Sequence, residues 1–303
     1  MKPITMKKIT ILSVLLSLSA LTYAQKSALF KFKYAPDRTY TMNSKMDMAT
    51  EMDLKSDSTN QVTNTSGSKL KVHMDINELM GASAKTAKAI AKSLPFTLSC
   101  NNYSISQKVN INGKENTLTG GNTIVGKILN GSIDKNGKMS TDTVVNGVPI
   151  SVEVKSGSAA LLREMRPQTM NFPDKQMKIG DTFTQEEPMT DINVPDMGIT
   201  KQVNVKVTYK LTAIKGNLAY FDTASTFNMD INEHDTRRTI TGKGDGSGTG
   251  KMIYNIADNY PQSKVNDINV AFNIEGHSTK PSTLKASMKI KRSTAVEYLV
   301  SVN

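Results

Sequence analysis

Residues 39–55 read TYTMNSKMDMATEMDLK, a stretch in which apolar and polar side chains alternate. Alternation with a period of two residues indicates a β-strand with one buried and one solvent-exposed face. One face carries Tyr40, Met42, Met46, Met48, Met52 and Leu54. At ~3.3 Å per residue the strand is about 50 Å long, and strands of that length coil or bend. The stretch therefore predicts a strongly curved sheet.

The same alternation recurs in the C-terminal half of the chain, over residues 203–213, 219–231, 268–274 and 284–302. The turn Lys215-Gly216-Asn217 joins the first two stretches, as expected of an antiparallel hairpin with a short loop. Strands with one polar face and short turns favour an antiparallel meander over a parallel α/β sheet. We therefore expect a mainly β protein, with long antiparallel strands in one or two strongly curved, half-barrel-like sheets.

Two short helical patterns interrupt the strands. The first spans residues 77–94 and ends before a proline, and the second spans residues 158–166. We expect both helices to cover a concave face of the sheet. Because each helix precedes a group of strands, the pattern predicts two β-rich lobes, residues 25–155 and 156–303, or one continuous domain over residues 25–303.

Three lysines share one side of the first predicted helix: Lys85, Lys88 and Lys92. Their spacing of three and four residues brings their ammonium groups together. One interpretation is a solvated face that aids solubility. The other is a surface that contacts an anionic membrane transiently, with about 1 kcal/mol from each lysine.

The first 24 residues have the features of a secretory signal peptide. Lys2, Lys7 and Lys8 form a positive region, residues 9–21 are mostly apolar, and Ala24 ends the segment. No cysteine lies near the expected cleavage site, so we expect no lipoprotein anchor. No second apolar run reaches the ~20 residues of a membrane span. We therefore expect an exported protein that is soluble in the periplasm or outside the cell.

The composition narrows the classes of partner and chemistry. The formal net charge is +11, but the lysines are scattered along alternating strands with few aromatic residues, so nucleic acid is not an expected partner. Cys100 is the single cysteine, so no internal disulfide can form. The three histidines lie far apart in sequence, and no common metal, nucleotide or nucleophile motif occurs. We expect no catalytic residues, no metal site and no cofactor.

The methionines of the opening stretch are the first candidates for contact with a ligand: Met42, Met46, Met48 and Met52. Thioether side chains are flexible, so they fill irregular gaps in a core and also adapt to varied apolar ligands. Both interpretations fit the spacing, and a soft-metal site is not expected because no His or Cys accompanies the methionines.

A glycine-rich run over residues 242–250 is the second candidate, with three glycines on one face: Gly244, Gly246 and Gly248. The run matches no phosphate-binding motif. Its period fits a strand whose glycine face is approached closely by something bulky. Side chains of the protein itself, or a ligand or partner chain, would satisfy that requirement.

Three motifs carry a resemblance to a known family. They are Lys178-Ile179-Gly180-Asp181-Thr182-Phe183, the glycine-rich run followed by residues 251–256, and the set Phe30, Phe32, Tyr40, Thr41 and Met42. The chain resembles, over most of its mature length, a family of secreted β-rich proteins of Bacteroidota that is catalogued as a domain of unknown function. The resemblance implies a β-rich envelope protein and no particular activity.

Together these features predict a non-enzymatic binding or carrier protein of the bacterial envelope. The expected ligand is apolar or amphipathic, such as a lipid, because long strands, a methionine-rich inward face and covering helices resemble half-barrel lipid carriers at the level of fold. The alternative is a structural or interaction protein of the envelope, which needs no small-molecule ligand.

Overall fold

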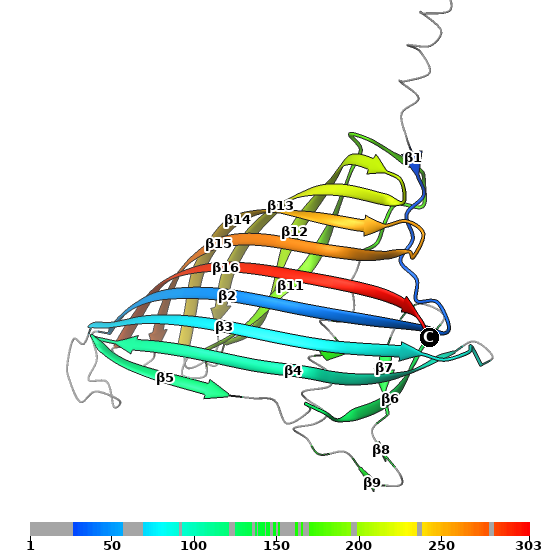
Figure 1. Cartoon of the computed structure of the whole chain (residues 1–303). Coiled ribbons are helices and arrows are strands. Elements are labelled where there is room, and N and C mark those ends of the chain that lie inside the picture. The colour runs from blue at the N-terminus through cyan, green and yellow to red at the C-terminus, as the bar shows by residue number, and fades with distance from the viewer. Residues whose placement is uncertain are drawn as a thin grey trace, which may run out of the picture.

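The computed structural model describes residues 27–303 except 57–68, 91–92, 121–124, 135–136, 138, 143, 146–147, 150, 152–160, 163–164, 166–169, 195–198, 235–237 and 279–281. The predicted signal peptide lies outside the described residues. Those that are described lie mostly in β-strands, as Figure 1 shows. Among them, no helix is long and apolar enough to cross a membrane.

Twelve strands form one antiparallel sheet. In spatial order its main path is β11 (Thr182–Val194), β12 (Ile199–Lys215), β13 (Leu218–His234), β14 (Arg238–Asn255), β15 (Tyr260–Ser278), β16 (Ser282–Val302), β2 (Arg38–Ser56), β3 (Lys69–Thr86), β4 (Leu94–Ile111), β6 (Ile128–Ile133) and β7 (Met139–Thr141). The twelfth strand, β5 (Lys114–Gly120), also pairs with β4. Two small sheets pair β1 (Ser27–Ala28) with β10 (Met177–Lys178) and β8 (Val144–Val145) with β9 (Val148–Pro149).

The strands are unusually long. β2 has 19 residues and β16 has 21, whereas strands of globular proteins usually have about five or six. The two strands pair antiparallel over the whole length of β2. The prediction of a mainly β protein with long antiparallel strands is therefore confirmed.

The sheet curls over its own inner face. β11 and β15 are four places apart in the strand order, which would separate them by about 19 Å in a flat sheet. Nevertheless, Lys264 Nζ on β15 lies 2.7 Å from Glu187 Oε2 on β11. Two side chains cannot bridge that distance across a flat surface, so the sheet must bend. Figure 1 shows β11 and β12 passing behind the other strands.

Two separate clusters of buried side chains form the core, and the segment before β2 contributes to both. Phe30 packs against Phe221 and Tyr254 in the first cluster, with ring centroids 5.3 and 5.7 Å apart. Tyr34 lies in the second cluster, where its ring is 4.8 Å from that of Tyr40. We call the end of the sheet where β2 begins the proximal end and the opposite end the distal end. The segment before β2 runs along the proximal end of the sheet (Figure 1).

The predicted helix over residues 77–94 is wrong. Residues 77–86 belong to β3, which pairs with β2 on one side and β4 on the other. Alanine and lysine favour helices, but two rows of strand pairing override this weak preference. The small residues instead suit the packing of the sheet. Buried Ala82 and Ala84 lie opposite Met42 and Tyr40 and leave room for these large side chains.

The second predicted helix, over residues 158–166, lies mostly outside the described residues. Leu161, Leu162 and Met165 are described, and they are helical and buried. The hydroxyls of Tyr34 and Tyr260 both donate hydrogen bonds to the Met165 carbonyl oxygen, at 3.0 and 3.1 Å. The covering role of this helix stays a prediction. The division into two lobes between residues 155 and 156 also stays a prediction. The sheet is continuous across that division, because β2 of the first part pairs with β16 of the second.

Candidate functional site

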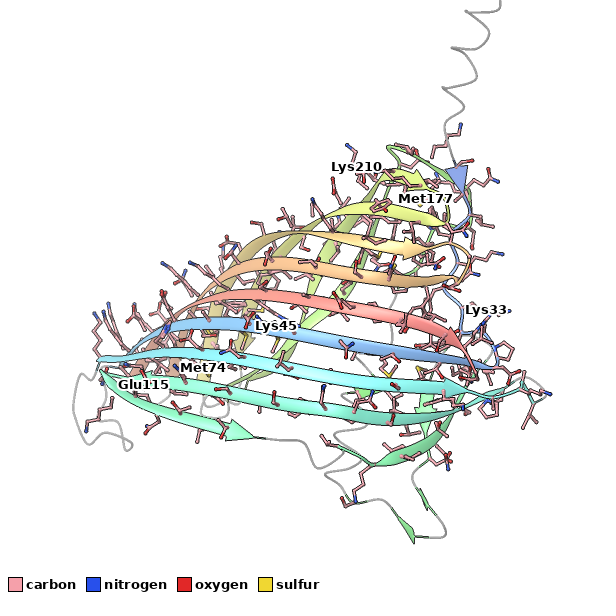
Figure 2. All side chains as sticks on the ribbon, viewed as in Figure 1. Lys33, Lys45, Met74, Glu115, Met177 and Lys210 are labelled. Atoms are coloured by element: carbon pink, nitrogen blue, oxygen red, sulfur yellow. The ribbon has the colours of Figure 1, made fainter. Side chains whose placement is uncertain are left out.

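A strip of apolar side chains on the inner face is the candidate site. We call it the methionine strip, and it consists of Met46, Met48, Met52 and Leu54 on β2, Leu70, Val72, Met74 and Ile76 on β3, and Ile105 and Val109 on β4. All ten side chains are half-buried, and none belongs to either core cluster. Met74 lies toward the distal end of β3 (Figure 2). The strip is therefore inner-face surface that the two cores do not use. It has charged neighbours on the same face, because Glu78 on β3 lies opposite Met46 and Arg292 on β16 lies opposite Met48.

Strand register builds the strip. Met48 lies opposite Ile76, and Met52 lies opposite Val72, so apolar side chains of neighbouring strands stand side by side. Cross-strand pairs of this kind hold side chains within about 5 Å of one another. Along β2 the strip runs from Met46 to Leu54, which is about 26 Å at ~3.3 Å per residue.

The four predicted methionines differ in their surroundings. Met42 is fully buried in the second core cluster, where it lies opposite Tyr298 and Ala82. Met46, Met48 and Met52 lie on the methionine strip. Alternation in the sequence was sufficient to place them on one face, whereas the difference in burial depends on distant segments. Their contact with a ligand stays a prediction.

The predicted glycine run lies on β14, and side chains of neighbouring strands reach close to it. A Cβ on Gly244 would lie 2.5 Å from Cδ1 of Phe272 and 3.1 Å from Cε1 of Phe227. Gly246 and Gly248 are similarly close to the backbone of β15, at 2.6 and 2.4 Å from carbonyl oxygens. The protein's own rings and backbone thus occupy the space in front of these glycines. A ligand-facing role for them stays a prediction.

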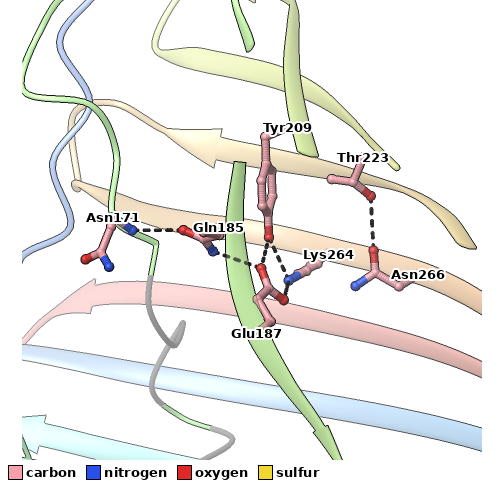
Figure 3. A network of polar contacts seen from close by, with 7 residues as sticks. All are labelled: Asn171, Gln185, Glu187, Tyr209, Thr223, Lys264 and Asn266. Carbon is pink, nitrogen blue, oxygen red and sulfur yellow. Dashed lines mark hydrogen bonds and ion pairs between the residues drawn. The ribbon is translucent and has the colours of Figure 1, made fainter. Parts of the chain in front are cut away.

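A network of polar side chains ties the edge strand β11 to β15 (Figure 3). Lys264 Nζ donates to Glu187 Oε2 at 2.7 Å and to the Tyr209 hydroxyl at 2.9 Å. The Tyr209 hydroxyl donates to Glu187 Oε1, and Gln185 Nε2 donates to the same oxygen at 2.9 Å. The side chains of Lys264 and Glu187 are only 18% and 15% exposed. We call this the β11–β15 tie.

The charges of the tie stabilise one another. Burial opposes ionisation of Glu187, but the Lys264 ammonium and three hydrogen bonds more than offset it, so the pKa of Glu187 lies below its ordinary value. Burial and the Glu187 carboxylate raise the pKa of Tyr209, so its phenol stays protonated and donates. Because the carboxylate oxygens already accept these bonds, the arrangement suits structural stabilisation better than proton transfer.

Sequence reasoning missed the tie, although one signal was present. Glu187 follows Phe183 and Gln185 at a period of two residues, which places its carboxylate on the inner face of the strand. A charged residue on an inner face requires a partner. Lys264 comes from a strand 77 positions later, and no local pattern links the two.

The predicted membrane-surface lysines lie at the proximal end. Lys85 is exposed near the end of β3, Lys88 is exposed just after it, and Lys92 lies outside the described residues. Because residues 77–86 form part of a strand and Lys88 is not helical, Lys85 and Lys88 do not share a helical face. Ile90 beside them is 68% exposed. Contact of these residues with a membrane stays a prediction.

The described residues contain no group of three or more His, Cys, Asp or Glu side chains that could hold a metal ion. Two histidines contact single carboxylates instead, His73 with Asp75 at 3.2 Å and His277 with Glu275 at 3.3 Å. Burial raises the pKa of the Cys100 thiol, which disfavours the reactive thiolate.

No protein-family model matches the sequence, and a comparison with curated proteins gives no match. Among solved structures, the chain is weakly similar to the outer membrane protease OmpT from Escherichia coli, with 7% identity, a TM-score of 0.23, and coverage of 89% of this chain and 99% of that one. OccK7 (OpdD) from Pseudomonas aeruginosa gives 5% identity, a TM-score of 0.26, and coverage of 86% and 99%. The Salmonella secretin InvG gives 8% identity and a TM-score of 0.19, with coverage of 99% of this chain and 71% of that one. Such low TM-scores indicate neither a common fold nor a common function.

Proposed function

We propose that the protein is a non-enzymatic binding or carrier protein of the bacterial envelope that holds an apolar or amphipathic ligand, such as a lipid, on the methionine strip. It is exported, with residues 1–24 removed, and it is soluble in the periplasm or outside the cell. The methionine strip carries this proposal, because its ten apolar side chains belong to neither core. Covering them with a ligand would gain about 25 cal/mol for each Å² of apolar surface removed from water.

The character of the side chains supports a ligand of variable shape. Met46, Met48, Met52 and Met74 have unbranched, rotatable side chains that adapt to different apolar surfaces. The length of the strip also fits a hydrocarbon chain. Half of a ~30 Å bilayer core is about 15 Å, which is the depth that an acyl chain spans in one leaflet. The strip, at about 26 Å, is longer.

A change of Met74 to Asp tests the proposal. An ionised carboxylate in the middle of the strip should weaken binding of a fluorescent fatty acid at least tenfold, because burying it against a hydrocarbon chain is costly. Leu79→Asp is the matched control, since Leu79 is on the same strand, faces outward and is 49% exposed. Equal binding by the two variants, or no binding by the unmodified protein, would contradict the proposal.

The alternative function, a structural or interaction protein of the envelope, is favoured by a different feature. All seven residues of the outlying strand β5 are exposed, and such strands can pair with another chain. Native mass spectrometry of protein purified from its own envelope separates the two functions. Co-purified lipid supports the carrier, whereas a protein partner without lipid supports the alternative.

A further inference from the structure

Three lysines stand side by side at the distal end of the outer face. Lys55 on β2 lies directly opposite Lys69 on β3 and Lys285 on β16, and all three are exposed. Directly opposed like charges on neighbouring strands repel one another and destabilise a sheet. We call this set the lysine row. Its repulsion would be relieved by an anion bound across it.

The sheet neutralises only part of this charge. Lys285 forms an ion pair with Glu275 at 3.0 Å. Lys55 and Lys69 have no ion-pair partner among the described residues. The three lysines and Lys243 line a trough of about 1000 Å³, together with the carboxylates of Asp53, Asp230 and Glu275. The trough is therefore large enough to admit polar groups of a ligand beside the lysine row.

The lysine row lies at the same end of the sheet as the distal limit of the methionine strip. Leu54 and Leu70 are the last members of the strip at that end, and they pair with each other across β2 and β3. Each is next to a lysine of the row in sequence, so one rim presents leucines inward and lysines outward. A hydrocarbon chain leaving the strip at this rim would bring its polar headgroup near Lys55 and Lys69.

We propose that the lysine row docks the distal end of the protein on a membrane surface rich in anionic lipid, so that the lipid enters or leaves the methionine strip at this rim. The proposal rests on the carrier function proposed above. It differs from the sequence-based expectation for Lys85 and Lys88, which lie at the opposite end of β3. Membrane contact therefore involves the distal end rather than the proximal end.

Co-sedimentation with vesicles tests the proposal. The unmodified protein should bind phosphatidylglycerol vesicles at low salt, release them at high salt, and bind phosphatidylcholine vesicles weakly. A lysine near an anionic surface contributes about fivefold to binding, so Lys55→Gln with Lys69→Gln should weaken binding roughly tenfold or more. The matched control is Lys85→Gln with Lys88→Gln, which removes the same charge from the proximal end and should leave binding nearly unchanged.

The outcomes separate this inference from the carrier function. If both double variants lose vesicle binding equally, or if only the proximal variant loses it, the distal rim is not the docking site. Vesicle binding should persist in Met74→Asp, because that residue lies on the inner face and its substitution leaves the lysine row intact. A failure of fatty acid binding alone would remove the carrier function and leave the docking surface.

Discussion

Met42 and Met52 are the same residue type on the same face of the same strand, yet one is fully buried and the other is half-buried. Around Met42, rings from several segments form the second core, among them Tyr34 from the segment before β2. Met52 belongs to neither core. Alternation thus decides on which face of the sheet a side chain lies. Segments distant in sequence decide whether that part of the face is buried.

The largest effect is expected where the sheet curls over its inner face. Lys264→Met removes the cation of the β11–β15 tie and leaves the Glu187 carboxylate buried, which should lower the free energy of unfolding by about 3–5 kcal/mol. Lys45→Met is the matched control, because it breaks the exposed Lys45–Asp47 pair, worth less than about 1 kcal/mol. Urea unfolding measures both. Equal losses would show that the tie does not hold the sheet.

The two methionines give the next prediction. Met42→Ala should lower the free energy of unfolding by about 2–5 kcal/mol, because it opens a cavity in the second core cluster. Met52→Ala removes the same atoms from a half-exposed site and should cost on the order of 1 kcal/mol or less. Thermal unfolding monitored by circular dichroism compares the variants. If Met52→Ala proved as costly as Met42→Ala, the distal inner face would be core rather than a binding surface.

The smallest effect concerns pH. The pKa of Glu187 in the folded protein lies below its unfolded value of about 4.3, so the unfolded chain takes up the proton first on acidification. Ionised Glu187 therefore stabilises the fold fully above that value, and the contribution is lost as the pH falls through the folded pKa. Urea unfolding between pH 7 and pH 3 should show the difference between the unmodified protein and Glu187→Gln shrinking in acid. A difference that stays constant would exclude this linkage.

Local patterns in the sequence predicted the strands correctly because each residue's face follows from its place in the alternation. The stretch of residues 39–55 is almost the whole of β2, and residues 203–213 lie within β12. The same reasoning failed at residues 77–86, where small residues suited to packing against Met42 and Tyr40 resembled a helical pattern. There the deciding contacts come from β2 and β4 and leave no trace in the local sequence.

The candidate site could be predicted only in part for the same reason. Met46, Met48 and Met52 were identified from the alternation of one strand. The contribution of β3, including Val72 and Met74, became apparent only from the register that sets them against β2. Neither the β11–β15 tie nor the lysine row could be found in the sequence, because each requires knowledge of which strands meet.

The pairing of β2 with β16 has a consequence for how the protein acquires its structure. These strands lie near opposite ends of the described chain, and the Asn303 amide nitrogens donate to the carbonyl oxygens of Asp37 and Thr86 at 3.1 Å. During synthesis, β2 emerges early, and the edge that pairs with β16 stays unpaired until β16 is made. Contacts so distant in sequence form slowly, and unpaired strand edges aggregate. The edge of β2 that faces β16 is therefore open to wrong pairing until the last strand of the sheet is made.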